Sequence, residues 1–258
     1  MTDQAIPLRA PRPFAPNHPA DRDFFLALVG LIWVGIIGGF GLDMIDHVRH
    51  SNRAYPLIVH LHALLFVGWL MLLTTQVLLI RNRRTDLHRR LGMAMAWLIP
   101  VMVVMGLAAA WTVQHQVALL EGPHNTQFLS INLTDMLGFA SLAGAGVALR
   151  RDSPAHKRLM LLATLYLSTA GFARLWLLTI GPGLATTGFW GFLIVFNIGG
   201  DLLIAALGVY DLVTRKRLHP AYVMGAGWIL ANEAAAAWLF FSPSWKLISL
   251  RLLGLAGG

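Results

Sequence analysis

The stretch YPLIVHLHALLFVGWLMLLTTQVLLIRNRRTDLHRR (residues 55–90) decides the fold, because it joins a long apolar run to a strongly basic segment. A transmembrane helix needs about 20 consecutive, mostly apolar residues, and Lys and Arg concentrate in cytoplasmic loops. The stretch therefore predicts a membrane-spanning helix that ends on the cytoplasmic side. Two histidines, His60 and His62, lie inside this helix. An ionisable side chain within a bilayer is costly and marks a functional site by default.

The composition indicates a membrane protein. Of the 258 residues, 57% are hydrophobic and only 12% are charged, whereas a soluble domain has about 25% charged residues. The formal net charge is +8, but the basic residues lie in short loops between apolar runs, so we expect no nucleic-acid partner. The chain has no cysteine, which excludes disulfides, iron–sulfur clusters and thiolate metal sites.

Apolar runs recur along the chain, so the predicted fold is an all-α, polytopic transmembrane bundle of about seven spans within residues 24–241. The spans are predicted at 24–44, 56–80, 91–113, 128–149, 158–180, 188–210 and 221–241. Three connections are strongly basic, namely RNRRTDLHRR (81–90), RRDSPAHKR (150–158) and RKRLH (215–219). The two connections at 113–127 and 181–188 contain no Lys or Arg. This alternation predicts a cytoplasmic N-terminus and an outer C-terminus.

Both ends of the chain are predicted to lie outside the bundle. Residues 1–23 contain proline and mixed charge but no apolar run, so they predict a disordered or interfacial tail and not a cleaved signal peptide. Residues 242–258 are too few to cross a bilayer. Trp245, Ile248, Leu252 and Leu255 recur there at helical spacing, which predicts an interfacial helix on the outer surface.

Polar residues from several spans are predicted to meet near the outer face. At about 1.5 Å of rise per residue, four of them lie about 6–10 Å below the outer ends of their spans. These four are His60, His62, Asp135 and Arg174. The end of the first span adds a D-x-x-D-H-x-x-H pattern at the outer rim, made by Asp43, Asp46, His47 and His50. Asp201, Asn232 and Glu233 are predicted to lie deeper and to form a second polar site.

Helical geometry separates the two histidines of the second span. His62 shares a face with Phe66, Trp69, Leu73 and Gln76, whereas His60 points to the opposite side. We therefore expect His62 to face a cofactor and His60 to lie at the rim. A helix with polar groups on both sides is also expected to be central in the bundle.

Our first functional hypothesis is a haem or transition-metal site near the outer face, with a redox role. Neutral imidazole is a common ligand of haem iron, copper and zinc, so the expected cofactor is haem b or an ion of Cu, Fe or Zn. The predicted cofactor-binding residues are His62, His60, Trp69 and Arg174. The predicted metal ligands are His47, His50, Asp43, Asp46, Asp135 and His115. The motif HxHALLFxGW is also similar to the His-rich helix of haem-copper oxidase catalytic subunits.

Other functions stay open, and whether the chain is an enzyme is undecided. A proton-coupled transporter or channel would use Asp135, Arg174, Asp201 and Glu233. Seven spans with an inner N-terminus also resemble the ceramidase and progestin/adiponectin-receptor superfamily of membrane metal hydrolases. That family has histidines on its last span, and AYVMGAGWILANEAAAAWLFF has none. A purely structural role, with polar groups that only hold helices together, is the remaining alternative.

A faint internal repeat relates TDLHRRLGM (85–93) to SPAHKRLML (153–161). In each copy, Thr85 or Ser153 is predicted to cap the next helix, which puts His88 or His156 three residues into it. LHPA (218–221) also places a histidine at a predicted helix start, with Pro220 at the first helical position. These histidines serve either as caps and headgroup contacts or as a cytoplasmic cofactor or lipid site.

At HLHALLFVGW, HRRLG, HKRLMLLAT and YDLVTRKRLHPA the chain resembles a group of uncharacterised bacterial inner-membrane proteins. The resemblance covers residues 55–225 and implies a multi-pass protein of the bacterial inner membrane, without implying any site residue. The expected partners are the lipid bilayer and a quinone or another membrane protein. Gly35 and Gly39 in GIIGG predict a close helix contact, and a homo-oligomer through it is left open.

Overall fold

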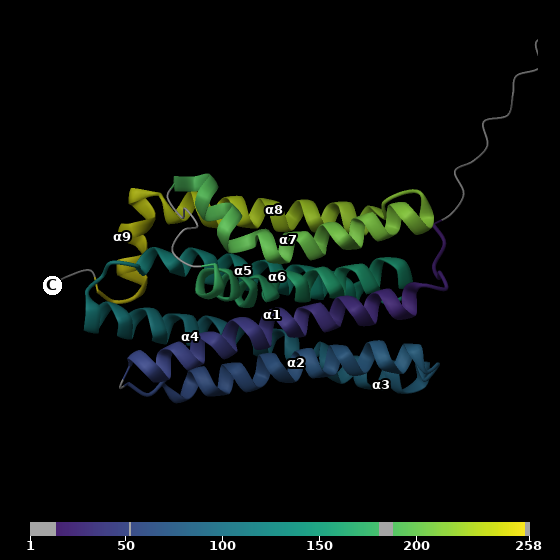
Figure 1. The fold of residues 1–258 in the computed structure, drawn as a ribbon, viewed down its shortest axis with the longest axis horizontal. Helices are drawn as coiled ribbons and strands as arrows, with labels where there is room; N and C mark the ends of the chain where they lie inside the picture. The colour runs from purple at the N-terminus through teal and green to yellow at the C-terminus, as the bar shows by residue number, and fades with distance from the viewer. Residues whose placement is uncertain (1–13, 52, 181–187, 256–258) are drawn as a thin grey trace, which may run out of the picture.

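The computed structural model describes residues 14–51, 53–180 and 188–255, and in these ranges it contains helices and no strand. Seven helical segments are long and apolar enough to cross a membrane, and Figure 1 shows them running side by side along one direction. The predicted all-α bundle is therefore confirmed. The elements are α1 (Asp21–His50), α2 (Leu57–Arg81), α3 (Thr85–Ala96), α4 (Leu98–Glu121), the short 3₁₀ helix η1 (Thr126–Phe128), α5 (Leu129–Ala148), α6 (Ser153–Thr179), α7 (Gly188–Arg215), α8 (Pro220–Phe240) and α9 (Pro243–Leu252).

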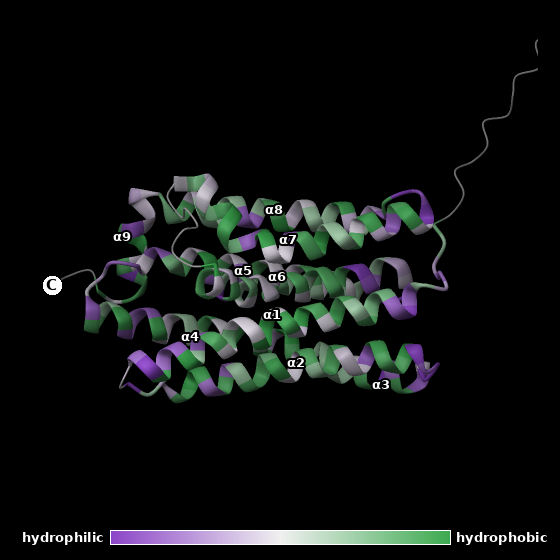
Figure 2. Cartoon of the chain, viewed as in Figure 1, coloured by the Kyte–Doolittle hydropathy of each residue, from purple (hydrophilic) through white to green (hydrophobic). Residues whose placement is uncertain are grey.

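The surface of the bundle fits a lipid bilayer. Figure 2 shows hydrophobic residues along the helices and hydrophilic residues gathered toward the two ends. Large apolar side chains point outward from several helices, including Val34, Leu64 and Trp238, which are 59%, 72% and 67% exposed. Soluble monomers rarely expose apolar surface this extensively. The chain is thus a multi-pass integral membrane protein in contact with lipid.

The third span differs from its prediction as one helix over 91–113. It consists of α3 and α4, which are separated at Trp97. Pro100 lies just inside α4, and a proline has no N–H to donate to the carbonyl four residues earlier, which its ring also crowds. That carbonyl belongs to Ala96, the last residue of α3. The proline therefore accounts for the break.

Helix α6 is the centre of the bundle. It packs against α1, α5, α7 and α8, and more of its residues are buried than in any other described span. The expectation of a central second span is wrong, because α2 packs mainly against α1, α3 and α4. The reason lies on the His60 face of α2, where Leu64 and Val67 are exposed. These apolar side chains favour contact with lipid more strongly than one histidine near the helix end favours burial of this face.

The first and sixth helices cross closely through glycines. A side chain at Gly39 would collide with the Gly171 carbonyl, and one at Gly35 would collide with the Phe172 ring. Small residues at such positions allow helix backbones to approach in membranes. The close contact predicted at Gly35 and Gly39 is confirmed, and it lies between α1 and α6 of the same chain.

The N-terminal tail is partly fixed to the bundle, and the C-terminal segment contains the expected helix. Residues 1–13 lie outside the described residues, but residues 14–20 contact the bundle, since Lys157 Nζ donates to the Pro16 carbonyl at 2.7 Å and Arg215 Nε donates to the Ala15 carbonyl at 3.0 Å. The helix expected in 242–258 is present as α9. Trp245 Nε1 donates to the Gln127 carbonyl at 3.1 Å, so α9 folds back onto η1. Its place at a membrane interface stays a prediction.

The helix caps correct two residue assignments. Asp152, and not Ser153, caps α6 and accepts a bond from the Ala155 N–H at 3.1 Å. Thr85 is the first residue of α3 and makes no capping bond. The third assignment is confirmed, because His219 precedes Pro220 and its Nδ1 accepts from the Ala221 N–H at 3.1 Å.

Candidate functional site

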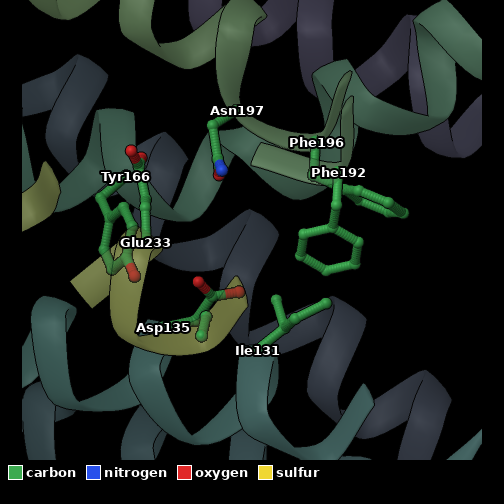
Figure 3. A pocket seen from close by; sticks show the side chains of 8 residues that line it. Ile131, Asp135, Tyr166, Phe192, Phe196, Asn197 and Glu233 are labelled. Carbon is green, nitrogen blue, oxygen red and sulfur yellow. The ribbon is translucent and has the colours of Figure 1, made fainter. Parts of the chain in front are cut away.

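A small pocket opens inside the bundle between α5, α6, α7 and α8. Its volume open to water is about 10 Å³, enough for about one water molecule. Figure 3 shows Tyr166 and Glu233 on one side and the two Phe rings on the other, with Asp135 and Asn197 between them. The lining residues are Ile131, Asp135, Tyr166, Phe192, Phe196, Asn197, Glu233 and Ala236. Two carboxyl groups, a phenol and an amide thus meet within an apolar wall.

Glu233 reaches the pocket because small residues bring α8 close to α5. Ala236 and Ala237 follow it and are 5% and 0% exposed. Ser130 Oγ of α5 donates to the Ala236 carbonyl at 3.1 Å. Glu233 itself is 3% exposed. The run AAAA at 234–237 thus serves as the packing surface that carries an acidic side chain into the bundle.

Asp201 of α7 and Glu233 of α8 lie within hydrogen-bonding reach of each other. Neither Glu233 oxygen accepts a bond from an N–H or hydroxyl donor. An ionised carboxylate can only accept hydrogen bonds. The contact between these two groups therefore needs a proton on one of them.

Asp135 of α5 faces the same pocket beside Tyr166 of α6. The ring of Tyr166 is 1% exposed and lies against Gly138, one turn after Asp135, where any side chain would collide with it. Gly138 therefore sets how closely the phenol approaches α5. Asp135 and Glu233 meet here, which differs from the prediction of Asp135 as an outer metal ligand.

The three acids have no cationic partner in the part of the chain that the structure describes. The ion pairs found there involve other carboxylates. Burying an ionised group is very costly unless it is paired. An arrangement of this kind suits the binding of a proton or a small cation.

The predicted metal ligands are divided among separate local contacts. His47 Nε2 bonds the Arg53 carbonyl at 2.8 Å, and His50 Nδ1 lies 3.1 Å from Asp46 at the exposed end of α1. Asp43 instead pairs with Arg174 at 3.5 Å. Among the described residues, no group of three or more His, Asp or Glu side chains is placed to hold a metal ion.

His115 makes contacts of its own with other residues. Its Nδ1 bonds the Leu253 carbonyl at 2.8 Å, and its ring stacks on Trp111 at 4.9 Å. The residue therefore fixes the segment after α9 to α4. Its predicted partnership with the end of α1 is not found.

The predicted cofactor-binding residues also separate. His60 is exposed, and Trp69 is buried two turns deeper, where its Nε1 donates to Thr164 Oγ1 at 3.1 Å. His62 does face inward, with its ring centre 4.0 Å from that of Phe66 and its Nδ1 buried without a partner. Arg174 lies near enough to act on it electrostatically. His62 and Arg174 are thus the two that the structure brings together.

Comparison with known proteins gives no family model, no curated protein and no solved structure that matches the chain. The resemblance to bacterial inner-membrane proteins stays a prediction. The fold and the pocket define a polytopic α-helical membrane protein with an acidic site inside its bundle.

Proposed function

We propose that the chain is a proton-coupled membrane transporter or channel, in which the pocket acids bind and release the coupling ion. The pair of Asp201 and Glu233, which has no cationic partner among the described residues and includes a buried carboxyl group with both oxygens unpartnered, carries this proposal. Intramembrane carboxyl groups of this kind mark proton relays and ion pathways in pumps and transporters.

The chemistry follows from the pairing of two acids. Two carboxylates at one site cannot easily both be ionised, because like charges at short distance raise the energy of the charged form. Loss of the shared proton from Asp201 and Glu233 would create repulsion between α7 and α8. Binding of a proton or a small cation removes that repulsion, so occupancy of the pocket is coupled to the packing of these two helices.

Asp135 and Tyr166 extend the pair toward α5 and α6. A phenol both donates and accepts hydrogen bonds, so Tyr166 is suited to pass a proton between Asp135 and the water-sized space beside Glu233. Asn197, one turn before Asp201 on α7, adds an amide that can orient a solute or a water molecule. Residues of α5, α6, α7 and α8 would thus contribute to one proton-binding site.

Proton flux into liposomes tests the proposal. The full chain is reconstituted with a pH-sensitive dye inside, and an inward proton gradient is imposed with K⁺ and valinomycin to set the potential. We expect flux above that of protein-free liposomes, and its loss in Asp201→Asn and Glu233→Gln. Asp86→Asn, at an exposed position 60% open to solvent, is the matched control and should retain the flux.

An infrared measurement detects the shared proton directly and does not depend on transport. A protonated carboxyl group gives a C=O band that a carboxylate does not, and we expect this band in the wild-type chain at neutral pH. Its loss in Glu233→Gln or Asp201→Asn supports the shared proton. Wild-type flux in both variants, together with an unchanged band, contradicts the proposal.

We further infer that the N-terminus is cytoplasmic and that the membrane is a bacterial inner membrane. The turns after α2, α5 and α7 lie at one end of the bundle (Figure 1), and each is basic. Short basic loops remain in the cytoplasm.

A haem at the outer end is the second candidate function, and the unpartnered Nδ1 of His62 favours it. A ring nitrogen buried beside Phe66 and near Arg174 suits an axial ligand with a cation for a propionate. The absorption spectrum of the purified chain tests this candidate. We expect a Soret band that shifts on reduction and that His62→Ala removes while His88→Ala retains it. A colourless wild-type protein rejects the haem.

A further inference from the structure

The two copies of the internal repeat meet in space. His88 of α3 and His156 of α6 hold corresponding positions in the copies, and their ring centres lie 6.3 Å apart at an interplanar angle of 83°. Gln76, near the end of α2, completes the group from a third helix. These residues lie at the end of the bundle opposite His62, away from the acidic pocket.

The hydrogen bonding of the two histidines leaves one ring nitrogen free on each. His156 Nδ1 bonds the Gly146 carbonyl at 2.8 Å, and a carbonyl can only accept, so Nδ1 carries the hydrogen and Nε2 keeps the lone pair. His88 Nδ1 is buried and has no hydrogen-bond partner among the described residues, so this nitrogen is available to bind an ion.

Gln76 adds an unsatisfied amide to the same place. Its side chain is 7% exposed, and neither its oxygen nor its nitrogen has a hydrogen-bond partner. Its Oε1 lies 3.7 Å from the position that a Cβ on Gly92 would take. Gly92 is one turn after His88 on α3, so the amide is turned toward the helix face that carries His88. A buried polar group without a partner normally indicates a missing ligand or water.

We propose that His88 Nδ1, His156 Nε2 and Gln76 Oε1 form a binding site for a late first-row transition-metal ion, with Cu²⁺ and Zn²⁺ as its ligand class. Metal-bound histidines typically donate their other N–H to a backbone carbonyl, as His156 does here. Two metal–nitrogen bonds of about 2.0 Å, added to the distance from each ring centre to its nitrogen, reach the 6.3 Å separation when the two nitrogens lie on opposite sides of the ion. Square-planar Cu²⁺ takes this arrangement, whereas tetrahedral Zn²⁺ requires the two rings to move closer together.

The surrounding charge limits which ions fit the site. Arg89 acts electrostatically on His88 and opposes any cation, so attraction by charge does not hold the ion. Imidazole forms strong coordinate bonds with Cu and Zn, whereas Mg²⁺ and Ca²⁺ prefer carboxylate and carbonyl oxygens. The site therefore selects for ions that bond nitrogen, and it excludes the hard cations.

Metal titration of the whole chain tests the site. Protein purified in detergent and stripped with a chelator is titrated with Cu²⁺ or Zn²⁺ by calorimetry, and bound metal is counted by mass spectrometry. We expect one ion per chain, and at least a tenfold weaker affinity in each of His88→Ala and His156→Ala. Gln76→Leu should weaken binding less. His60→Ala is the matched control on exposed surface, and it should bind as the wild type does.

Two further readouts make the outcome decisive. The paramagnetic resonance spectrum of bound Cu²⁺ should carry the coupling of two imidazole nitrogens, and His88→Asn should reduce it to one while circular dichroism confirms that the variant is folded. A wild-type chain that binds no metal, or an affinity unchanged in both histidine variants, overturns the proposal. Asp201→Asn should leave metal binding intact, so failure of the transport proposal is recognised separately.

Discussion

Arg158 and Asp211 are both fully buried and form an ion pair where α6 begins and α7 ends. Arg158 Nε donates to Asp211 Oδ2 at 2.6 Å, and its Nη1 donates to the Pro154 carbonyl at 2.8 Å. Arg215 is a second cation beside Asp211, at 3.7 Å. At the scale of single residues, this buried pair is thus held by several directed contacts.

Removal of one member of this pair leaves a buried charge without its partner. We expect Asp211→Asn to lower the free energy of unfolding by about 3–5 kcal/mol. Asp86→Asn removes an exposed partner of Arg84 and should cost less than about 1 kcal/mol. Thermal unfolding in detergent measures both. Equal stability of the two variants means that the buried pair adds nothing beyond a surface pair.

His219 makes stability depend on pH. Burial lowers the pKa of His219 below its usual 6.5, and the nearby Arg158 and Arg217 lower it further. Asp152 and Asp211 act in the opposite direction, but the net shift is downward. Between the two pKa values the unfolded chain binds more protons, so stability rises with pH there. Stability should accordingly fall as the pH drops below 6.5.

The matched variant for this prediction is His219→Asn, which keeps a side chain able to cap α8. The free energy of unfolding of wild type minus variant, followed from pH 8 to pH 5 (the range in which histidine titrates), should decrease toward low pH. A difference that stays constant over this range assigns the pH dependence to other groups.

Sequence reasoning located ionisable residues inside spans but not their partners. The prediction that Glu233 lies deeper than Asp135 is wrong, because each residue lies about 10 Å from the outer end of its helix at 1.5 Å per residue. Depth therefore permitted Asp135 to join either the rim or the pocket. The choice depends on which face of α5 meets α6 and α8, and Gly138 against Tyr166 decides it. The periodicity of one helix does not contain that information.

At the scale of elements, hydropathy predicts the spans well and their ends poorly. Helix α1 continues to His50, beyond the predicted end at residue 44, and α6 begins at Ser153, before the predicted start at 158. Backbone hydrogen bonding continues into polar residues once a helix has left the hydrocarbon. Pro100 was a visible signal for the break between α3 and α4, because proline removes a helical hydrogen bond, but the apolar run around it reads as continuous.

The close crossing of α1 and α6 predicts how adding one methyl group changes the stability of the chain. Gly39→Ala places a Cβ against the Gly171 carbonyl, and overpacking of this kind costs about 1–3 kcal/mol. Gly30→Ala on the same helix meets nothing within 4 Å and should stabilise the chain by up to about 1 kcal/mol, since alanine favours a helix. Thermal unfolding of both variants checks this, and a stable Gly39→Ala variant rules out a tight crossing.

At the scale of the whole molecule, the proposed orientation places the basic turns on the cytoplasmic side. Because the chain has no cysteine, a single one reports its own side of the membrane. We expect a membrane-impermeant thiol reagent on intact cells to label His124→Cys, in the connection after α4, and not Asn82→Cys, which ends α2. Permeabilised cells, in which both should react, are the control. The reverse pattern inverts the topology.

The central position of α6 has a consequence for how the chain is made. Helix α1 enters the membrane first, yet its glycine face has no partner until α6 emerges, after three further spans have been synthesised. The early helices must therefore remain in lipid, or beside the insertion machinery, with packing surfaces that are not yet buried against α6. A ribosome stalled before residue 153 would hold α1 and α5 without the helix against which both pack, and the native assembly would form only after α6 has been made.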